Sequence, residues 1–269
     1  MRTLILLLMT CGVFFAAAAP EAEWRKQAEK LEKDGNWREA YELRVKLLRK
    51  ISDKASGKDL SLALNSQNRL REQKNFDALL DELTVSRKDN PDFMLAAGQA
   101  YLSAQHYGQL LDDEFQRGSR VSGEWKQVQE QDRLRALQCY IQAWDKVKKG
   151  GKEEVQVLRA LAGALNWNRN GGYLWRLYLK ADLAATPDYT EQDDVITSSG
   201  APVGKDGELD YINMPESWET AASDGERWRW LMAEIARISP ADGSQEMLGW
   251  LRFCQQNYGV NTLASYGWW

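Results

Sequence analysis

The stretch that decides the fold is residues 24–47, WRKQAEKLEKDGNWREAYELRVKL. An Asp-Gly-Asn sequence at 34–36 divides it, and such residues end helices and form turns. On either side, apolar residues recur at the spacing of a helix face, which predicts two antiparallel helices. The recurring positions are Trp24, Ala28 and Leu31, then Trp37, Ala40, Tyr41, Leu43 and Leu47.

The same arrangement returns further along the chain, where an aromatic residue opens the second helix of each pair. Trp37, Phe76 and Tyr107 hold this position, 39 and 31 residues apart. These intervals bracket the period of roughly 34 residues of tetratricopeptide-type helix pairs. We expect helices from Phe76 through Leu83 and from Tyr107 through Leu111. The first hairpin resembles a tetratricopeptide repeat through Trp24, Ala28, Leu31, Gly35, Trp37 and Ala40.

Helical spacing continues over most of the remaining chain, and it is lost only in residues 188–216, which are rich in Asp, Gly, Ser and Pro. A long insert without periodicity is either a functional loop or a surface loop. The further helices that we expect are 125–144, 155–165, 173–178, 228–235 and 247–258.

Each helix pair needs neighbours to cover its apolar face. We therefore predict an all-α fold in which antiparallel helix pairs stack as an irregular tetratricopeptide-like solenoid with one long loop. The helical-repeat domain would span 19–185, the irregular loop 186–217, and a C-terminal helix pair, 218–269, would pack on the repeats.

Residues 1–18 have the features of a secretory signal peptide. Arg2 precedes an apolar stretch, Leu4–Phe15, and the small residues Ala16–Ala19 follow. We expect cleavage after Ala18 and an exported chain, periplasmic or extracellular, that starts at Ala19. An uncleaved anchor is the first alternative, but the 12 apolar residues are fewer than the roughly 20 of a spanning helix.

Lipid attachment at Cys11 is the second alternative for the leader, and Thr10 is a poor residue before an acylated cysteine. The mature chain has no apolar run of spanning length, so we expect no membrane-spanning segment. The net charge of −4 and the absence of a basic run argue against nucleic acid as a partner. Cys139 and Cys254 permit one disulfide at most, and the sequence does not decide whether they pair.

Two later segments carry a wider resemblance. The segment 223–228, SDGERW, and the segment 258–263, YGVNTL, accompany an export signal and irregular helix pairs. Together they resemble the N-terminal helical region of bacterial alpha-2-macroglobulin-like proteins. The resemblance implies association with protease inhibition and with downstream domains of a larger chain. It does not extend to the thioester, since the family's motif has glutamine three residues after the cysteine, where Asn257 follows Cys254.

The residues offer no recognisable catalytic, cofactor or metal site. The single histidine, His106, lies in an expected turn, where we interpret it as a solvated residue, and no serine or cysteine motif accompanies it. One histidine with two mature cysteines is too little for a conventional zinc site. The carboxylate clusters, 112–114, 193–194 and 206–210, lack the ligand spacing of a calcium-binding loop, and we interpret them as solvated charge.

Twelve tryptophans are the strongest anomaly of the composition. Trp24, Trp37, Trp144, Trp228 and Trp250 fall on apolar stripes, so we interpret them as packing between helices. Trp167 and Trp175 flank a glycine-rich turn and are the better candidates for an exposed surface.

We predict an exported, non-catalytic interaction module or scaffold, whose partner is another protein or a downstream domain of a larger chain. It would be the leading region of a macroglobulin-like inhibitor if the resemblance holds. The alternative is a glycan-binding or glycan-cleaving protein of the cell envelope that uses acidic residues and tryptophans.

Overall fold

The computed structural model describes residues 20–51, 55–71, 73, 75–111, 114–118, 123–169, 171–185 and 208–258. The predicted signal peptide, 1–18, lies outside these residues, as does most of the expected long loop. The elements, in chain order, are α1 (Pro20–Lys33), α2 (Trp37–Lys50), α3 (Ser56–Leu70), α4 (Phe76–Ser86), α5 (Pro91–Ser103), β1 (Tyr107–Leu111), β2 (Glu114–Arg117), β3 (Glu124–Gln127), α6 (Gln129–Lys146), α7 (Lys152–Leu165), the 3₁₀ helix η1 (Gly171–Tyr178), α8 (Asp224–Ile238) and α9 (Pro240–Asn257).

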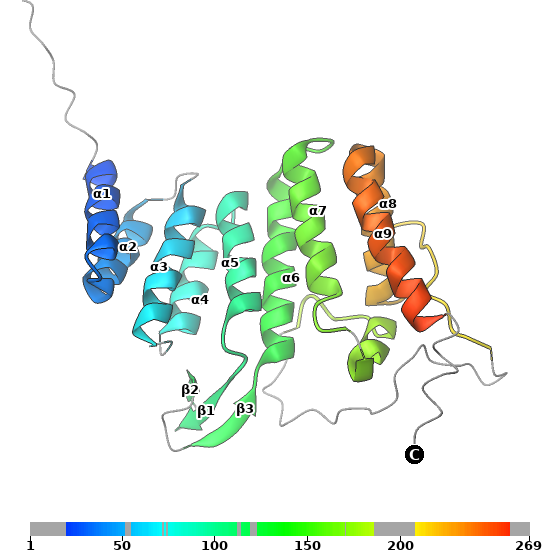
Figure 1. The fold of residues 1–269 in the computed structure, drawn as a ribbon, viewed down its shortest axis with the longest axis horizontal. Helices are drawn as coiled ribbons and strands as arrows, with labels where there is room; N and C mark the ends of the chain where they lie inside the picture. The colour runs from blue at the N-terminus through cyan, green and yellow to red at the C-terminus, as the bar shows by residue number, and fades with distance from the viewer. Residues whose placement is uncertain are drawn as a thin grey trace, which may run out of the picture.

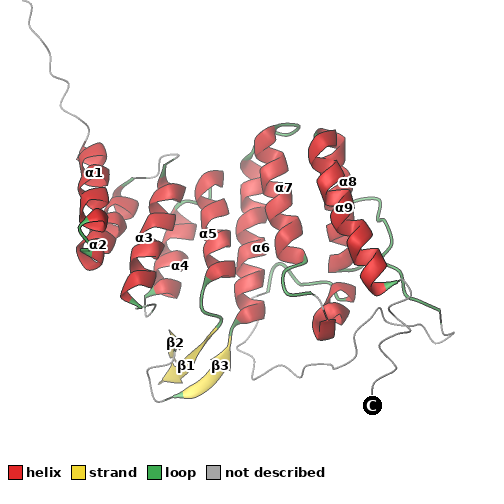
Figure 2. Cartoon of the chain, viewed as in Figure 1, coloured by secondary structure: helices red, strands yellow, loops and turns green. Residues whose placement is uncertain are grey.

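The described chain is mainly helical, which confirms the predicted all-α class, and its helices stand side by side in one row (Figure 1, Figure 2). Helix α1 packs on α2, α2 on α3, α3 on α5 and α5 on α6, and the series continues through α7 and α8 to α9. Most contacts therefore join elements close in sequence, as in repeat proteins. The tetratricopeptide-like character of the row stays a prediction.

The first three helices are tied together by a buried arginine as well as by apolar packing. Ala28 and Ala40 are fully buried where α1 meets α2, so the small residues predicted for this contact lie there. The guanidinium of Arg44, 1% exposed, donates to Glu32 at 3.0 Å and to Asp59 at 3.1 Å. A buried charge needs such partners, so α2 is fixed to both neighbouring helices.

The prediction of a helix from Tyr107 is wrong, and so is the prediction that a helix begins at Trp125. Both residues lie in a three-stranded antiparallel sheet of order β2-β1-β3, between α5 and α6. A Cβ at Gly108 would lie 2.3 Å from the carbonyl oxygen of Gln116, so β1 and β2 approach closely at this glycine. Glycine also weakens a helix, and pairing with two strands outweighs the local apolar spacing.

The segment 173–178 forms the 3₁₀ helix η1 rather than the expected α-helix, with Leu174 and Leu177 buried. Of the expected loop, residues 208–217 are described, and they carry no helix. Ile212 is only 2% exposed there, because it packs against Gly225 of α8. The end of this stretch is therefore held against the helical row.

Helix α9 buries a different face from the one that its apolar spacing predicts. Met247, Leu248 and Leu251 are 47–55% exposed. The buried side carries Phe253, 8% exposed, and Gly243, whose Cβ position would lie 2.3 Å from Ala236 of α8. Close approach at this glycine sets the rotation of α9. Among the described helices, none is both long and apolar enough to cross a bilayer.

Candidate binding groove

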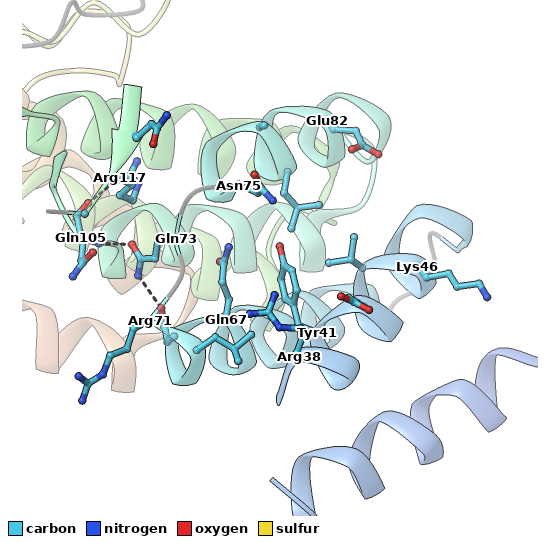
Figure 3. Close-up of a pocket in the computed structure, with 18 of the residues that line it drawn as sticks. Arg38, Tyr41, Lys46, Gln67, Arg71, Gln73, Asn75, Glu82, Gln105 and Arg117 are labelled. Atoms are coloured by element: carbon cyan, nitrogen blue, oxygen red, sulfur yellow. Dashed lines mark hydrogen bonds between the residues drawn. The ribbon is translucent and has the colours of Figure 1, made fainter. Parts of the chain in front are cut away.

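An open groove of about 1260 Å³ crosses α2, α4 and the C-terminal end of α3 (Figure 3). Gln116 and Arg117 of β2, with the following Gly118, line it at the sheet end. Figure 3 draws Arg38, Tyr41 and Gln67 near one another in the middle of the groove, with Arg117 and Gln105 at one end and Lys46 at the other. The groove is large enough for a peptide-sized ligand.

Two kinds of polar side chain dominate the lining. Among the described lining residues six are basic, against the two carboxylates Glu42 and Glu82. Six others are carboxamides, which offer both hydrogen-bond donors and acceptors. The basic set is Arg38, Lys46, Arg49, Lys50, Arg71 and Arg117, and the carboxamide set is Gln67, Asn68, Gln73, Asn75, Gln105 and Gln116.

The floor of the groove combines a short apolar strip with a buried amide. Val45 and Leu79 are at most 8% exposed, and burial raises the pKa of Tyr41 above its ordinary value, although Arg49 opposes the shift. Gln67 is only 3% exposed, and its Oε1 has no hydrogen-bond partner among the described residues. Buried carbonyl oxygens are rarely left without a donor, so Gln67 is the atypical polar group of the groove.

The carboxamides nearer the sheet are linked to one another. Gln73 donates from Nε2 to Asn68 Oδ1 at 2.8 Å, and its Oε1 accepts the main-chain N–H of Gln105 at 3.3 Å. Arg117 Nη1 in turn donates to the Gln105 carbonyl at 2.5 Å. This wall is therefore fixed, whereas the Gln67 carbonyl is not engaged.

Arg117 anchors the sheet end of the groove. Its side chain is 1% exposed and donates to Asp77 on α4 at 2.6 Å and to Asp132 on α6 at 2.7 Å. Burial lowers the pKa of Arg117, but the hydrogen bonds to Asp132 and Asp77 outweigh it and raise that pKa above its ordinary value. Arg117 is thus a permanent cation that joins β2 to two helices.

His106 is not the solvated turn residue that the sequence predicts. Its side chain is 23% exposed, its Nδ1 lies 2.9 Å from Asp132 Oδ2, and its ring meets the Trp167 ring edge-on at 4.9 Å. No hydrogen bond joins it to serine, threonine or cysteine in the described part of the chain. Asp132 also binds Arg117, so the histidine belongs to a polar network that includes this arginine.

The structure describes little of the carboxylate clusters. Asp112, Asp113 and 193–194 lie outside the described residues, and so does Asp206. Glu208 and Asp210 belong to the non-helical stretch before α8. No group of three His, Cys, Asp or Glu side chains placed to hold a metal ion occurs within the described ranges.

Three of the five tryptophans interpreted as packing residues contact other rings. Trp144 meets Trp218 and Trp230, and Trp228 meets Trp250 and Phe253. The other two lie under cations: Trp24 under Lys46 and Lys50, and Trp37 under Arg69 at 5.6 Å.

The choice of Trp167 and Trp175 as exposed residues is wrong, because both are half-buried. Trp125, which the sequence places in a helix, is 45% exposed and stacks on Tyr107 at 4.9 Å. Cys139 and Cys254 do not form a disulfide, and burial raises the pKa of the Cys139 thiol to about 12. Burial also raises the pKa of the Cys254 thiol.

The sequence does not predict the groove, because its residues come from four segments that are brought together by folding. The signal present in the sequence is the carboxamide-rich 67–75, between two helices of the unit that departs most from the repeat pattern. No family model, curated protein or solved structure matches the chain.

Proposed function

We propose that the chain is an exported, non-catalytic interaction module that binds a segment of a protein partner in the groove across α2, α3 and α4. The observation that carries this proposal is the open groove itself, lined by basic and carboxamide side chains on neighbouring helices. Helical repeats use such faces for binding.

Asp132 contacts His106 Nδ1 and also binds Arg117, so this network fixes the sheet end of the groove. In the wider resemblance, the module would be the leading region of a macroglobulin-like protein, and the bound segment would come from that assembly or from its target.

The test uses a bulky residue that fills the groove. Ala78 of α4 is exposed and lines the groove, whereas Ala233 of α8 is exposed and does not. Peptides selected from a displayed random library on the parent protein should lose binding to Ala78→Trp by about ten-fold or more, and should keep binding to Ala233→Trp, because only the first indole occupies the site.

Thermal unfolding of both variants would show that each is folded. Equal binding to Ala78→Trp and to the parent would overturn the groove as the binding site. Selection of no peptide at all, under conditions in which a known peptide-binding domain yields clones, would count against the proposal as a whole.

One observation favours the alternative of glycan binding. Trp125 lies 45% exposed on β3, stacked on Tyr107 with 20° between the rings, so a flat indole faces solvent on the sheet. Flat aromatic faces bind sugar rings. If this alternative holds, Trp125→Ala should abolish binding to cell-wall oligosaccharides, whereas Ala78→Trp should leave it intact.

A further inference from the structure

The groove is positive on a chain that is negative overall. The whole sequence carries a net charge of −4, yet basic residues exceed acidic ones in the groove lining. Arg49 is neutralised by Glu82, at 2.8 Å, and Arg117 by Asp77 and Asp132. Among the described lining residues, Lys46, Lys50 and Arg71 are further cations, and Glu42 is the one other carboxylate. Complementary charge selects partners and speeds encounter, so the groove favours an acidic ligand.

The second observation is the amide of Gln67. Its Oε1 is buried, lines the groove and accepts no hydrogen bond from the described residues. A buried acceptor without a donor costs free energy. A ligand that offers an N–H group at this point recovers that cost, and the N–H group that every peptide repeats is the one in its main chain.

The lining also distinguishes between shapes of ligand. An amphipathic helix buries a continuous apolar stripe, but the apolar floor is limited to short side chains such as Val45 and Leu79 beside the Tyr41 ring. A glycan prefers exposed flat rings, and Tyr41, with a half-buried ring, is the single aromatic residue among the described residues that line the groove. An extended peptide uses main-chain hydrogen bonds, which carboxamides match.

We infer that the groove takes an extended, acidic segment of a partner protein, with its main-chain N–H donating to Gln67 and its carboxylates lying along the basic residues. This inference rests on the proposed function, since it names the class of segment that the groove selects. Lys46 lies at one end of the groove and Arg71 near the other. The carboxylates of the bound segment should therefore be spread along the groove between these two residues.

The experiment measures binding to the purified chain by fluorescence anisotropy. The probes are a labelled peptide of alternating glutamate and serine, its glutamine counterpart, its lysine counterpart, and the glutamate peptide with N-methylated main-chain amides. The glutamate peptide should bind about ten-fold tighter than the glutamine peptide at low salt, and the difference should shrink as salt shortens the Debye length. The lysine peptide should not bind.

Two variants separate charge from the amide contact. Lys46→Glu should weaken binding of the glutamate peptide by about five-fold or more. Lys58 is an exposed lysine of α3 outside the groove, so Lys58→Glu should change this binding by less than about two-fold. Gln67→Met removes the buried carbonyl without leaving a void. It should unfold at the same temperature as the parent or higher, and yet bind the glutamate peptide more weakly.

N-methylation completes the cycle. It should weaken binding to the parent more than binding to Gln67→Met, because the variant already lacks the acceptor of one of the hydrogen bonds that methylation removes. An equal effect on both proteins would overturn the role of Gln67. If the glutamine or lysine peptide binds in the groove better than the glutamate peptide, as judged by loss with Ala78→Trp, the acidic class is wrong while the proposed function stands. If oligosaccharides bind and no peptide does, both are wrong.

Discussion

At the scale of single residues, the buried cations are the most informative feature. Arg44 and Arg117 are each 1% exposed, and each holds two carboxylates from other elements. Guanidinium groups suit such sites because their fixed fork of N–H donors binds carboxylates in defined geometry. The two arginines thereby fix the relative positions of the elements that border the groove.

Replacement of Arg117 tests this role. Arg117→Met should lower the free energy of unfolding by about 3 to 5 kcal/mol, because Asp132 remains buried without its charged partner. Arg237→Met is the matched control, since Arg237 is 66% exposed in its ion pair with Glu234 and should contribute less than about 1 kcal/mol. Urea unfolding measures the free energy of unfolding of both variants. Equal losses in the two variants would contradict the stabilising role of the Arg117 network.

Glu154 makes stability depend on pH. Its side chain is 4% exposed and accepts from Trp144 Nε1 at 2.8 Å and from the Gly150 N–H at 2.5 Å. Burial raises the pKa of Glu154, but the Gly150 and Trp144 hydrogen bonds outweigh it, and the net pKa is lowered.

A lowered folded pKa stabilises the protein above the unfolded pKa of about 4.3, and this contribution is lost as pH falls through the folded value. The free energy of unfolding should therefore fall between about pH 5 and about pH 3, and Glu154→Gln should show a shallower fall. Urea titrations at each pH measure both. Parallel curves would show that Glu154 has an ordinary pKa.

At the scale of elements, glycines decide how closely helices approach. A Cβ at Gly98 of α5 would lie 2.3 Å from the buried Tyr140 ring of α6, whereas a Cβ at Gly163 of α7 meets nothing within 4 Å. Gly98→Ala should destabilise the protein by about 1 to 3 kcal/mol through overpacking. Gly163→Ala should stabilise it by roughly 0.5 to 1 kcal/mol, because alanine favours a helix. Thermal unfolding measures both variants. If both substitutions shifted the unfolding temperature in the same direction, the contrast between these two glycines would be wrong.

The elements also show where sequence patterns succeed and fail. Long periodic segments such as 155–165 fold as predicted, because their spacing agrees with their packing. The helix predictions at Tyr107 and Trp125 fail, because pairing in a sheet depends on partners elsewhere in the chain. In α9 two faces are apolar, and the choice between them follows from the contact of Gly243 with Ala236, which no local pattern contains.

At the scale of the whole molecule, the row of helices brings the groove together from distant segments. Residues of α2 between Arg38 and Lys50 belong to the same lining as Gln116 and Arg117 of β2. The helical class and the repeat of helix pairs follow from apolar spacing, whereas the groove requires knowing which helices are neighbours. That is why the sequence predicts a binding module and not the site at which it binds.

The N-terminal residues predict the compartment of the protein. The apolar stretch and the small residues at 16–19 predict cleavage after Ala18, because signal peptidase requires small residues at Ala16 and Ala18. Mass spectrometry of the protein from the periplasm or the medium should therefore find Ala19 at the N-terminus. A chain that retains Met1 and stays with the membrane fraction would refute this prediction.

An extended acidic segment of the partner should lie over Gln67 in the groove. Nuclear magnetic resonance of the ¹⁵N-labelled chain measures this directly, with the Gln67 side-chain amide assigned from its loss in Gln67→Met. Saturation with the peptide of alternating glutamate and serine should shift the Gln67 amide signals. Those of Gln138, whose amide donates to the carbonyls of Leu183 and Ala185, should stay in place. Binding of the peptide with the Gln67 signals unmoved would contradict the account.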